Sequence, residues 1–549
     1  MSGAVLNYIP PAIWADELCS ADQMAAFSDL DANASIVKLN ALRHNWLARF
    51  FLPGLIMVTA TGSIWPDQDP ELPNIILFIA DDWSFPHAGV YGDPVVQTPN
   101  FDRLAAGGML FTNAYCASPS CSPSRASILT GRYPHQNGAM GNLWSEFAAD
   151  ATVYPAVLED AGYLVGHDQK GWGPGDWRTT GWPHNPAGQN YGDITNLLAE
   201  REPGQPFCYW FGSQDPHREY QTNLGAWTGM EADSVVVPPF FPDLPCVRND
   251  MLDYYAEVER FDRHVGEVME LLEANGELDN TLVIVTSDNG MPFPRAKANL
   301  YDAGTRMPFV AHWPARIPAG TVRHSYVNLA SLAATFLQAA GLEVPASMTL
   351  PGLLDQLTDP ATPGADRVFL ERERHAQVRA DSGSYAVRGI RTDSFLYLRN
   401  FFPERWPGGD PEAVLSVGAY GDTDNSITKM LILDGQQPAM DTTDYFRLAF
   451  GKRPAEELYD LTQDPHQVRN LAGQAAYFSV QSRLSDQLFH FMEESGDPRV
   501  TDPRTSFWDT TRYTPTYGKH TYDLRTYIDD YRYARSTAHT HFDLLPCGE

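Results

Sequence analysis

The chain repeats short, uninterrupted apolar segments, each followed at once by polar residues. Asn74–Ala80, Phe207–Phe211 and Thr281–Thr286 are segments of this kind. A run of this length without polar alternation is typical of a strand buried on both faces of a parallel sheet. Helical patterns separate the runs over residues 73–370. The sequence therefore predicts an α/β fold built on a large, doubly wound, mostly parallel sheet.

Beyond residue 370 the pattern changes to short strands of antiparallel type, with a covering helix over residues 474–492. At 549 residues the chain is also longer than one ordinary core requires. We therefore predict a smaller C-terminal α+β domain beside the first. The predicted division is an N-terminal extension (1–70), a catalytic α/β domain (71–370), the α+β domain (371–500) and a C-terminal tail (501–549).

The charge of the chain is strongly acidic, with 39 Lys+Arg against 69 Asp+Glu and a net charge of −30. Such a surface argues against a nucleic acid partner, because phosphate backbones require clustered cations. An anionic substrate would need a local basic pocket to draw it in. The six cysteines show no C-x-x-C spacing, so neither a zinc ribbon nor a dense disulfide framework is indicated.

Residues 43–63 carry a basic stretch, a short apolar run and small residues, in that order. These are the parts of a secretory signal, and the apolar run is too short to span a bilayer. The segment lies some way into the chain, so we hypothesise that translation starts near Val37 or Leu39. The alternative is a buried helix within an ordinary extension. The first interpretation predicts a periplasmic or secreted protein with no stable membrane span.

Polar side chains follow two of the predicted strands where each ends. Asp81 and Asp82 follow the first run, and Asp288 and Asn289 follow a later one. In open α/β sheets the carboxyl ends of the strands form the ligand-binding edge. Three carboxylates and an amide oxygen suit Ca²⁺ or Mg²⁺ rather than zinc. Any single Asp here could equally be a turn former or helix cap.

Residues 121–132 combine a thiol, small hydroxyls and two guanidiniums within one short stretch. Pro123 suits the first turn of a helix, which would place Cys121 just before a helix N-terminus. Free backbone N–H groups and the helix dipole favour a tetrahedral oxyanion there. Single cations are usually only solvated, but several lie beside this stretch or after predicted strands, and we consider them catalytic candidates: Arg125, Lys170, His217, Lys297 and His135.

Cys121–Arg125 together with Leu129–Arg132 resembles the C-x-P-S-R…T-G-R signature of the formylglycine-dependent sulfatases, in the alkaline phosphatase-like superfamily. The order of the metal and cation candidates along the chain also matches, and the resemblance covers residues 73–475. Within the family the chain looks most similar to the N-sulfoglucosamine sulfohydrolase branch. The segments Asp215–Arg218 and Glu457–Asp460 are among those that resemble this branch.

The resemblance implies that a formylglycine-generating enzyme oxidises Cys121 to formylglycine. Its hydrated form would attack sulfur through one hydroxyl and expel sulfate through the other. Lys297 and His217 would stabilise or protonate the leaving group, while Lys170 and Arg125 would hold the anion. The implied cation is Ca²⁺ in preference to Mg²⁺, with ligands from Asp81, Asp82, Cys121, Asp288 and Asn289.

One position departs from the family pattern. Sulfatases usually carry Gly-Lys-x-His where this chain has Gln169-Lys170-Gly171-Trp172. The missing histidine normally assists the elimination step, and His135 is our candidate for a replacement base.

The leading functional prediction is a sulfatase that hydrolyses a sulfate ester or sulfamate on a sulfated carbohydrate. One alternative is a phosphodiester or phosphonate monoester hydrolase on the same scaffold, because phosphate and sulfate share tetrahedral geometry. The other is a non-catalytic protein that binds sulfated glycans.

Overall fold

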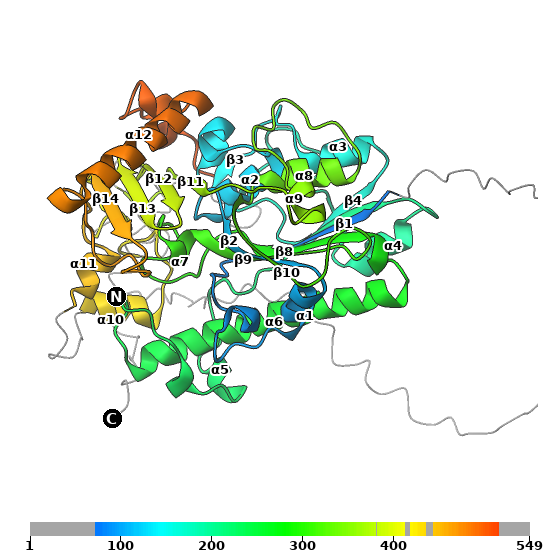
Figure 1. The fold of residues 1–549 in the computed structure, drawn as a ribbon, viewed down its shortest axis with the longest axis horizontal. Coiled ribbons are helices and arrows are strands. Elements are labelled where there is room, and N and C mark those ends of the chain that lie inside the picture. The colour runs from blue at the N-terminus through cyan, green and yellow to red at the C-terminus, as the bar shows by residue number, and fades with distance from the viewer. Residues whose placement is uncertain (1–71, 380–381, 412–417, 435–442, 515–549) are drawn as a thin grey trace, which may run out of the picture. The chain divides into compact units, whose positions relative to one another are not determined.

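The computed structural model describes residues 72–379, 382–411, 418–434 and 443–514 (Figure 1). The signal-like segment 43–63, the rest of the predicted extension and the tail beyond residue 514 lie outside the described residues. Among the helices that are described, none is both long enough and apolar enough to cross a lipid bilayer.

A mixed, mostly parallel sheet forms the centre of the described structure, as the sequence predicts. Its strand order is β10-β2-β9-β8-β1-β7-β4-β6, and only β9 runs antiparallel to its neighbours β2 and β8. The strands are β1 (Asn74–Ala80), β2 (Met109–Tyr115), β4 (Leu164–Gln169), β6 (Gln189–Asn190), β7 (Phe207–Gly212), β8 (Thr281–Ser287), β9 (Arg306–His312) and β10 (Thr321–Asn328).

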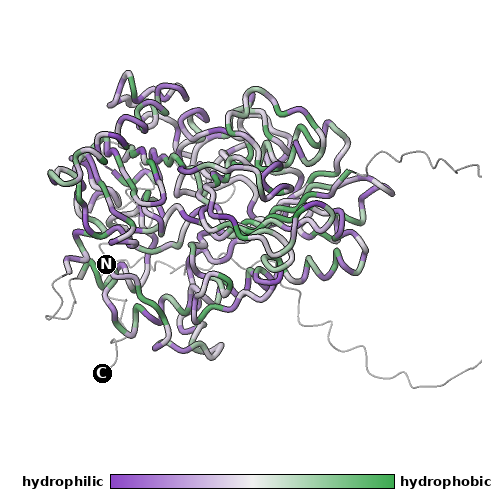
Figure 2. The backbone as a smooth tube through the Cα atoms, viewed as in Figure 1, coloured by the Kyte–Doolittle hydropathy of each residue, from purple (hydrophilic) through white to green (hydrophobic). Residues whose placement is uncertain are grey.

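Both faces of this sheet are buried, which explains why its strands read as continuous apolar runs. Along β1, Ile76 and Phe78 point into one hydrophobic core, whereas Ile75 and Leu77 point into the other. Figure 2 shows the central strands as a band of hydrophobic residues between the two helical layers.

Helices α1 and α6 cover one face, and α2, α3 and α8 cover the other (Figure 1). The helices are α1 (Pro99–Gly107), α2 (Cys121–Thr130), α3 (Tyr154–Asp160), α4 (Ile194–Glu200), α5 (Leu224–Trp227), α6 (Pro245–Ala274), α7 (Asp302–Thr305), α8 (Ser331–Ala339) and α9 (Leu354–Thr358). Helix α2 begins at Cys121 itself, so it starts slightly earlier in the chain than we predicted.

A second, antiparallel sheet follows, in the order β11-β12-β13-β14. Its strands are β11 (Arg367–Arg372), β12 (Val387–Thr392), β13 (Phe395–Asn400) and β14 (Glu456–Asp460), and the further helices are α10 (Ile427–Asp434), α11 (Tyr445–Ala449), α12 (Phe478–Ser495) and α13 (Phe507–Thr510). Helix α12 packs its apolar side on this sheet through Leu484 and Leu488. The boundaries of the two domains stay a prediction.

Candidate active site

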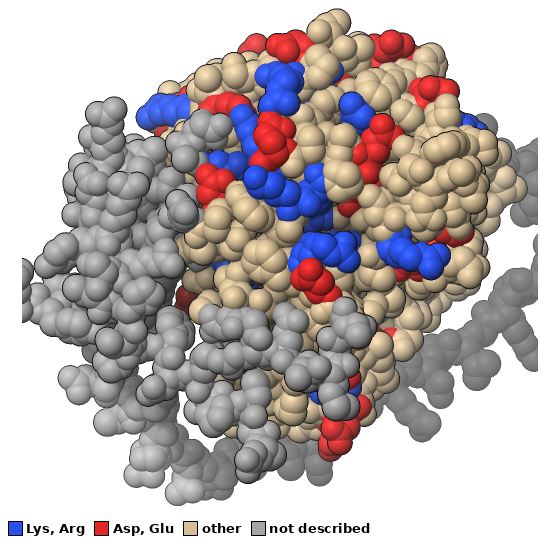
Figure 3. Space-filling view, turned by 90° about the vertical axis from the view of Figure 1, so that its left-hand side faces the viewer, with Lys and Arg blue, Asp and Glu red and all other residues tan. Residues whose placement is uncertain are grey.

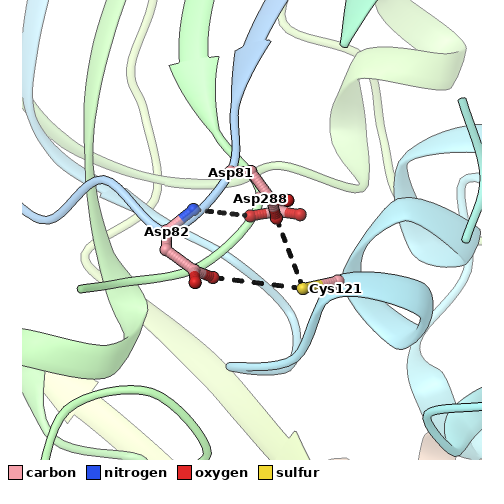
Figure 4. Close-up of side chains that lie close together, drawn as sticks. All are labelled: Asp81, Asp82, Cys121 and Asp288. Atoms are coloured by element: carbon pink, nitrogen blue, oxygen red, sulfur yellow. Dashed lines mark hydrogen bonds between the residues drawn. The ribbon is translucent and has the colours of Figure 1, made fainter. Parts of the chain in front are cut away.

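The side chains of the predicted metal site meet at the carboxyl edge of the central sheet. β1 and β8 pair in parallel with Ala80 opposite Ser287, so the residues that follow them emerge together. Figure 4 shows Asp81, Asp82 and Asp288 converging on Cys121. The Cys121 Sγ lies 3.4 Å from Asp81 Oδ1 and 4.0 Å from Asp82 Oδ1, while the Asp82 N–H donates to Asp288 Oδ1 at 3.2 Å. The strand pairing thus explains how residues distant in sequence form one site.

Cys121 is the first residue of α2, and the helix is buried along its whole length. Ser120 at the N-cap has extended backbone geometry, and the helix is followed by Gly131, whose φ of 64° is the left-handed conformation that glycine tolerates best. The side chain of Cys121 therefore lies beside the free N–H groups and the positive end of the helix dipole. This position suits a group that carries or binds an anion.

Two of the predicted cations lie on one side of the acidic cluster. Arg125 Nε donates to Asp288 Oδ2 at 2.7 Å, and its Nη1 donates to the carbonyl of Lys170 at 2.6 Å. Lys170 Nζ in turn donates to Asp81 Oδ2 at 2.5 Å. Arg125 is fully buried, so its charge is balanced by these carboxylates rather than by water.

Lys297 and His217 contact the cluster through Asp82. Lys297 Nζ donates to Asp82 Oδ2 at 2.7 Å, and His217 Nε2 lies 3.9 Å from the same oxygen. The His217 side chain is 35% exposed, whereas that of Asp82 is buried. His217 therefore marks the side of the cluster that solvent reaches.

Burial and neighbouring charges shift the pKa values of the groups in this cluster. Burial opposes ionisation of Asp81, but Lys170, His217 and Arg125 outweigh it and hold the pKa of Asp81 below its usual range. Burial dominates for the other two carboxyls, raising the pKa of Asp82 and raising that of Asp288 to about 6. Burial, with Asp81 next in importance, raises the pKa of the Cys121 thiol well above its usual value. An unmodified Cys121 is therefore a neutral thiol at neutral pH.

The donor set fits a hard divalent cation. Asn289 Nδ2 donates to Asp82 Oδ1 at 2.6 Å, which leaves the Asn289 Oδ1 buried without a hydrogen-bond partner. Ligand atoms of Asp81, Asp82, Cys121 and Asp288 all lie within 4.8 Å of one another. Adjacent buried carboxylates and an orphaned amide oxygen are stabilised together by a cation that prefers oxygen ligands.

His135 lies elsewhere. Its Nδ1 pairs with Glu371 Oε1 at 2.6 Å, and its Nε2 is 3.2 Å from the Ser495 carbonyl. Both ring nitrogens are thus engaged by residues of β11 and the end of α12. The structure therefore does not bring His135 into the cluster as the replacement base that we expected.

Trp172, at the position of the missing histidine, is a packing residue. Its side chain is buried, its Nε1 donates to the carbonyl of Ser122 at 3.1 Å, and its ring packs edge-on against Phe147. The indole therefore supports the first turn of α2.

The sequence interpretation missed two residues that lie beside the site. Asp424 Oδ2 is 3.1 Å from Lys297 Nζ, and its carboxylate lies within 4.8 Å of the ligand atoms of Asp82 and His217. His375 Nδ1 lies 2.8 Å from the Oγ of Ser120, the residue before Cys121. Both residues come well after β10, the last strand of the central sheet. No motif or regular spacing in the sequence indicates that they lie near Lys297 or Cys121.

The surface is not uniformly acidic despite the net charge. Figure 3 shows the face at the left of Figure 1, where Lys and Arg side chains gather in the middle among acidic ones. Local concentrations of positive charge of this kind can attract an anion to an acidic protein.

Comparison with known proteins identifies the family. The sequence model of the Sulfatase family matches residues 73–342, and that of the N-sulphoglucosamine sulphohydrolase C-terminal region matches residues 295–404. Human N-sulphoglucosamine sulphohydrolase is 31% identical over 484 residues, covering 78% of this chain and 92% of the human one. The chain belongs to the sulfatase family.

Further relatives extend this result. An ulvan-active sulfatase of Formosa agariphila is 28% identical over 446 residues, covering 78% of this chain and 81% of that protein. This sulfatase is accordingly a sulfuric ester hydrolase, as the sequence predicts.

Solved structures share the fold of this sulfatase at lower identity. One, a complex with the substrate D-glucosamine-2-N,6-O-disulfate, superposes with a TM-score of 0.57 at 21% identity, covering 78% of this chain and 98% of that one. A phosphonate monoester hydrolase from Silicibacter pomeroyi superposes with a TM-score of 0.55 at 18% identity, covering 77% and 96%. These similarities establish the architecture.

Proposed function

We propose that this sulfatase hydrolyses a sulfate ester or sulfamate on a sulfated carbohydrate, using a formylglycine derived from Cys121 and a divalent cation. The observation that carries the proposal is the position of Cys121, at the buried start of α2 and 3.4 Å from Asp81 Oδ1. An unmodified thiol among carboxylates is a poor nucleophile, whereas a hydrated aldehyde offers oxygen nucleophiles at the same position.

Asp81, Asp82, Asp288 and Asn289 would hold the cation together with the modified side chain of residue 121. Ca²⁺ suits these oxygen ligands, and Mg²⁺ is the alternative. When bound, the cation would help the hydrated formylglycine to supply a hydroxyl for attack on sulfur and a second hydroxyl for release of sulfate.

The chain's own cations would bind and orient the anion. Lys170 lies beside Asp81 near Cys121, and Arg125 is fixed by Asp288 and by the carbonyl of Lys170. Lys297 and His217, which lie beside Asp82, would neutralise or protonate the atom that leaves sulfur. Fixed cations in a buried site stabilise charge that develops in the transition state more strongly than water does.

The nature of the relatives favours sulfated glucosamine as the carbohydrate. The human relative acts on N-sulphoglucosamine by its name, and a structure of the same fold was solved with a glucosamine disulfate. Sulfated polysaccharides of other composition are the alternative, since another relative is named for ulvan. We further propose a periplasmic or secreted location, on the strength of the signal-like segment 43–63, and maturation by a formylglycine-generating enzyme.

Two measurements test the proposal. Peptide mass spectrometry of native protein should show residue 121 with its thiol replaced by an aldehyde, and purified enzyme should release sulfate from a panel of defined oligosaccharides that includes N-sulfated glucosamine. A Cys121→Ala variant is the control and should release none. Unmodified Cys121 in native protein that binds these glycans and leaves them intact would instead indicate a binding protein.

A phosphonate monoester or phosphodiester hydrolase is the second candidate. It is favoured by the fold shared with the Silicibacter pomeroyi enzyme and by the common tetrahedral shape of the two anions. We expect 4-nitrophenyl sulfate to be turned over with a higher kcat/KM than an aryl phosphate diester. The reverse order would favour this second candidate.

A further inference from the structure

The carboxylate of Asp424 forms part of the site although it lies far along the chain from Asn328, where the last strand of the central sheet ends. Its Oδ2 is 3.1 Å from Lys297 Nζ, and Lys297 is otherwise held by Asp82 Oδ2 at 2.7 Å. The ammonium of Lys297 thus lies between two carboxylates, of which Asp82 belongs to the proposed metal site and Asp424 does not.

Asp424 lies toward the open side of the cluster. Its side chain is 19% exposed, while those of Lys297 and Asp82 are 4% and 0% exposed. His217, the most exposed of the predicted cations, has its ring within 4.8 Å of the Asp424 carboxylate. A substrate that approaches Cys121 from solvent on this side would therefore meet His217, Lys297 and Asp424 together.

The segment that carries Asp424 is fixed from both sides. Asp422 Oδ2 accepts hydrogen bonds from Arg372 at 2.6 Å and Arg379 at 2.8 Å. On the other side, Lys429 Nζ donates to the carbonyl of Thr423, the residue before Asp424, at 2.7 Å. These buried contacts determine where Asp424 lies, so its approach to Lys297 is built into the structure rather than left to a free loop.

Positively charged side chains lie around the carboxylate of Asp424 and favour its ionised form. Lys297 and His217, with His375 next in importance, outweigh the effect of burial and hold the pKa of Asp424 below its usual range. A carboxylate therefore lies next to the two cations that would face the leaving group in the proposed function.

Resting on the proposed function, we propose that Asp424 is a positioning residue for the leaving-group side of the reaction. It holds Lys297 and His217 where they meet the oxygen or nitrogen that leaves sulfur. As the bond from sulfur to that atom breaks, its electron pair stays on the leaving atom, which takes a proton from one of these cations. The sulfuryl group passes to the nucleophile at residue 121.

This role predicts an effect that depends on the leaving group. A leaving group of low basicity departs without help, whereas a basic one requires the proton. An Asp424→Asn variant keeps the shape of the side chain and removes its charge. We expect its kcat to fall by about tenfold or more for sulfated glucosamine, by less for phenyl sulfate, and least for 4-nitrophenyl sulfate.

Asp262→Asn is the matched control, because it removes a buried carboxylate that accepts from the backbone of Asn100 and Phe101 and contacts neither Lys297 nor the segment of Asp424 in any described interaction. We expect this variant to be less stable and to lose activity equally on all three substrates. Its thermal unfolding, compared with that of Asp424→Asn and Asp424→Ala, separates loss of folded protein from loss of a chemical step.

The outcomes are distinct. Losses for Asp424→Asn that grow with leaving-group basicity support the proposal. Equal losses on all three substrates, or a change in KM alone, would overturn it while leaving the sulfatase function intact. A wild-type enzyme that releases sulfate from none of them would overturn the proposed function and this inference with it.

Discussion

Arg125 donates from Nε to Asp288 Oδ2 at 2.7 Å, and neither side chain is exposed to solvent. The pair joins the first turns of α2 to the end of β8, the two elements that bring Cys121 and the metal ligands together. In a buried ion pair, each charge compensates the other, so removing one partner leaves the other as an uncompensated charge away from water.

Removing one partner should therefore destabilise the fold as well as the site. We expect Arg125→Met to lower the free energy of unfolding by about 3–5 kcal/mol, because Asp288 would be left as an uncompensated buried charge. Equilibrium denaturation by urea measures this. The double variant Arg125→Met with Asp288→Asn should recover part of the loss, and strictly additive losses would contradict the pairing.

The oxygen cluster should bind calcium in a way that unfolding can detect. Addition of Ca²⁺ to chelator-treated protein should raise Tm, by the equivalent of about 2.7 kcal/mol at a hundredfold excess over Kd. Asn289→Ala should weaken this shift, since it removes the orphaned amide oxygen. Asp262→Asn is the matched control, because that buried carboxylate accepts from the Asn100 and Phe101 backbone instead. A full calcium shift in Asn289→Ala would contradict the assignment of this ligand.

Local patterns in the sequence predicted most of the fold and most of the cluster. Strand length and the absence of polar alternation identify β1 and β8, and the chain order then places Asp81 and Asp288 at one edge. The pairing of His135 with Glu371 could not be predicted this way, because it joins residues 236 positions apart. The approach of Asp424 to Lys297 is of the same kind, since it depends on how the C-terminal segment packs and not on any periodicity.

His135 should contribute to stability in a pH-dependent way. Burial opposes its charge, but Glu371 outweighs burial and raises the pKa of His135 above its ordinary value of 6.5. Its contribution is therefore fully present below pH 6.5 and is lost as pH rises through the raised pKa of the folded state. Urea midpoints measured across this range should fall with pH in the wild type.

His135→Gln tests the same residue. The variant should be less stable by about 1–3 kcal/mol at low pH and should show a smaller dependence on pH. Under conditions where it is folded, its kcat for aryl sulfate should match that of the wild type. If the variant were stable and folded but inactive, His135 would be a catalytic residue after all.

Trp172 stands where most sulfatases carry histidine, and restoring that histidine should not improve the enzyme. The indole is 2% exposed, donates to the Ser122 carbonyl and packs against Phe147. Trp172→His would remove much of this packing at the first turn of α2. We expect a loss on the order of 3 kcal/mol in unfolding free energy and no gain in kcat.

Trp172→Phe separates packing from the hydrogen bond in this prediction. It keeps most of the aromatic volume and removes only the donor to Ser122, so it should cost about 1 kcal/mol and retain most of the activity. Unfolding midpoints and initial rates on one aryl sulfate compare the two variants with the wild type. If Trp172→His turned over faster than the wild type, the indole would be blocking a catalytic position, and its assignment as a support for α2 would be wrong.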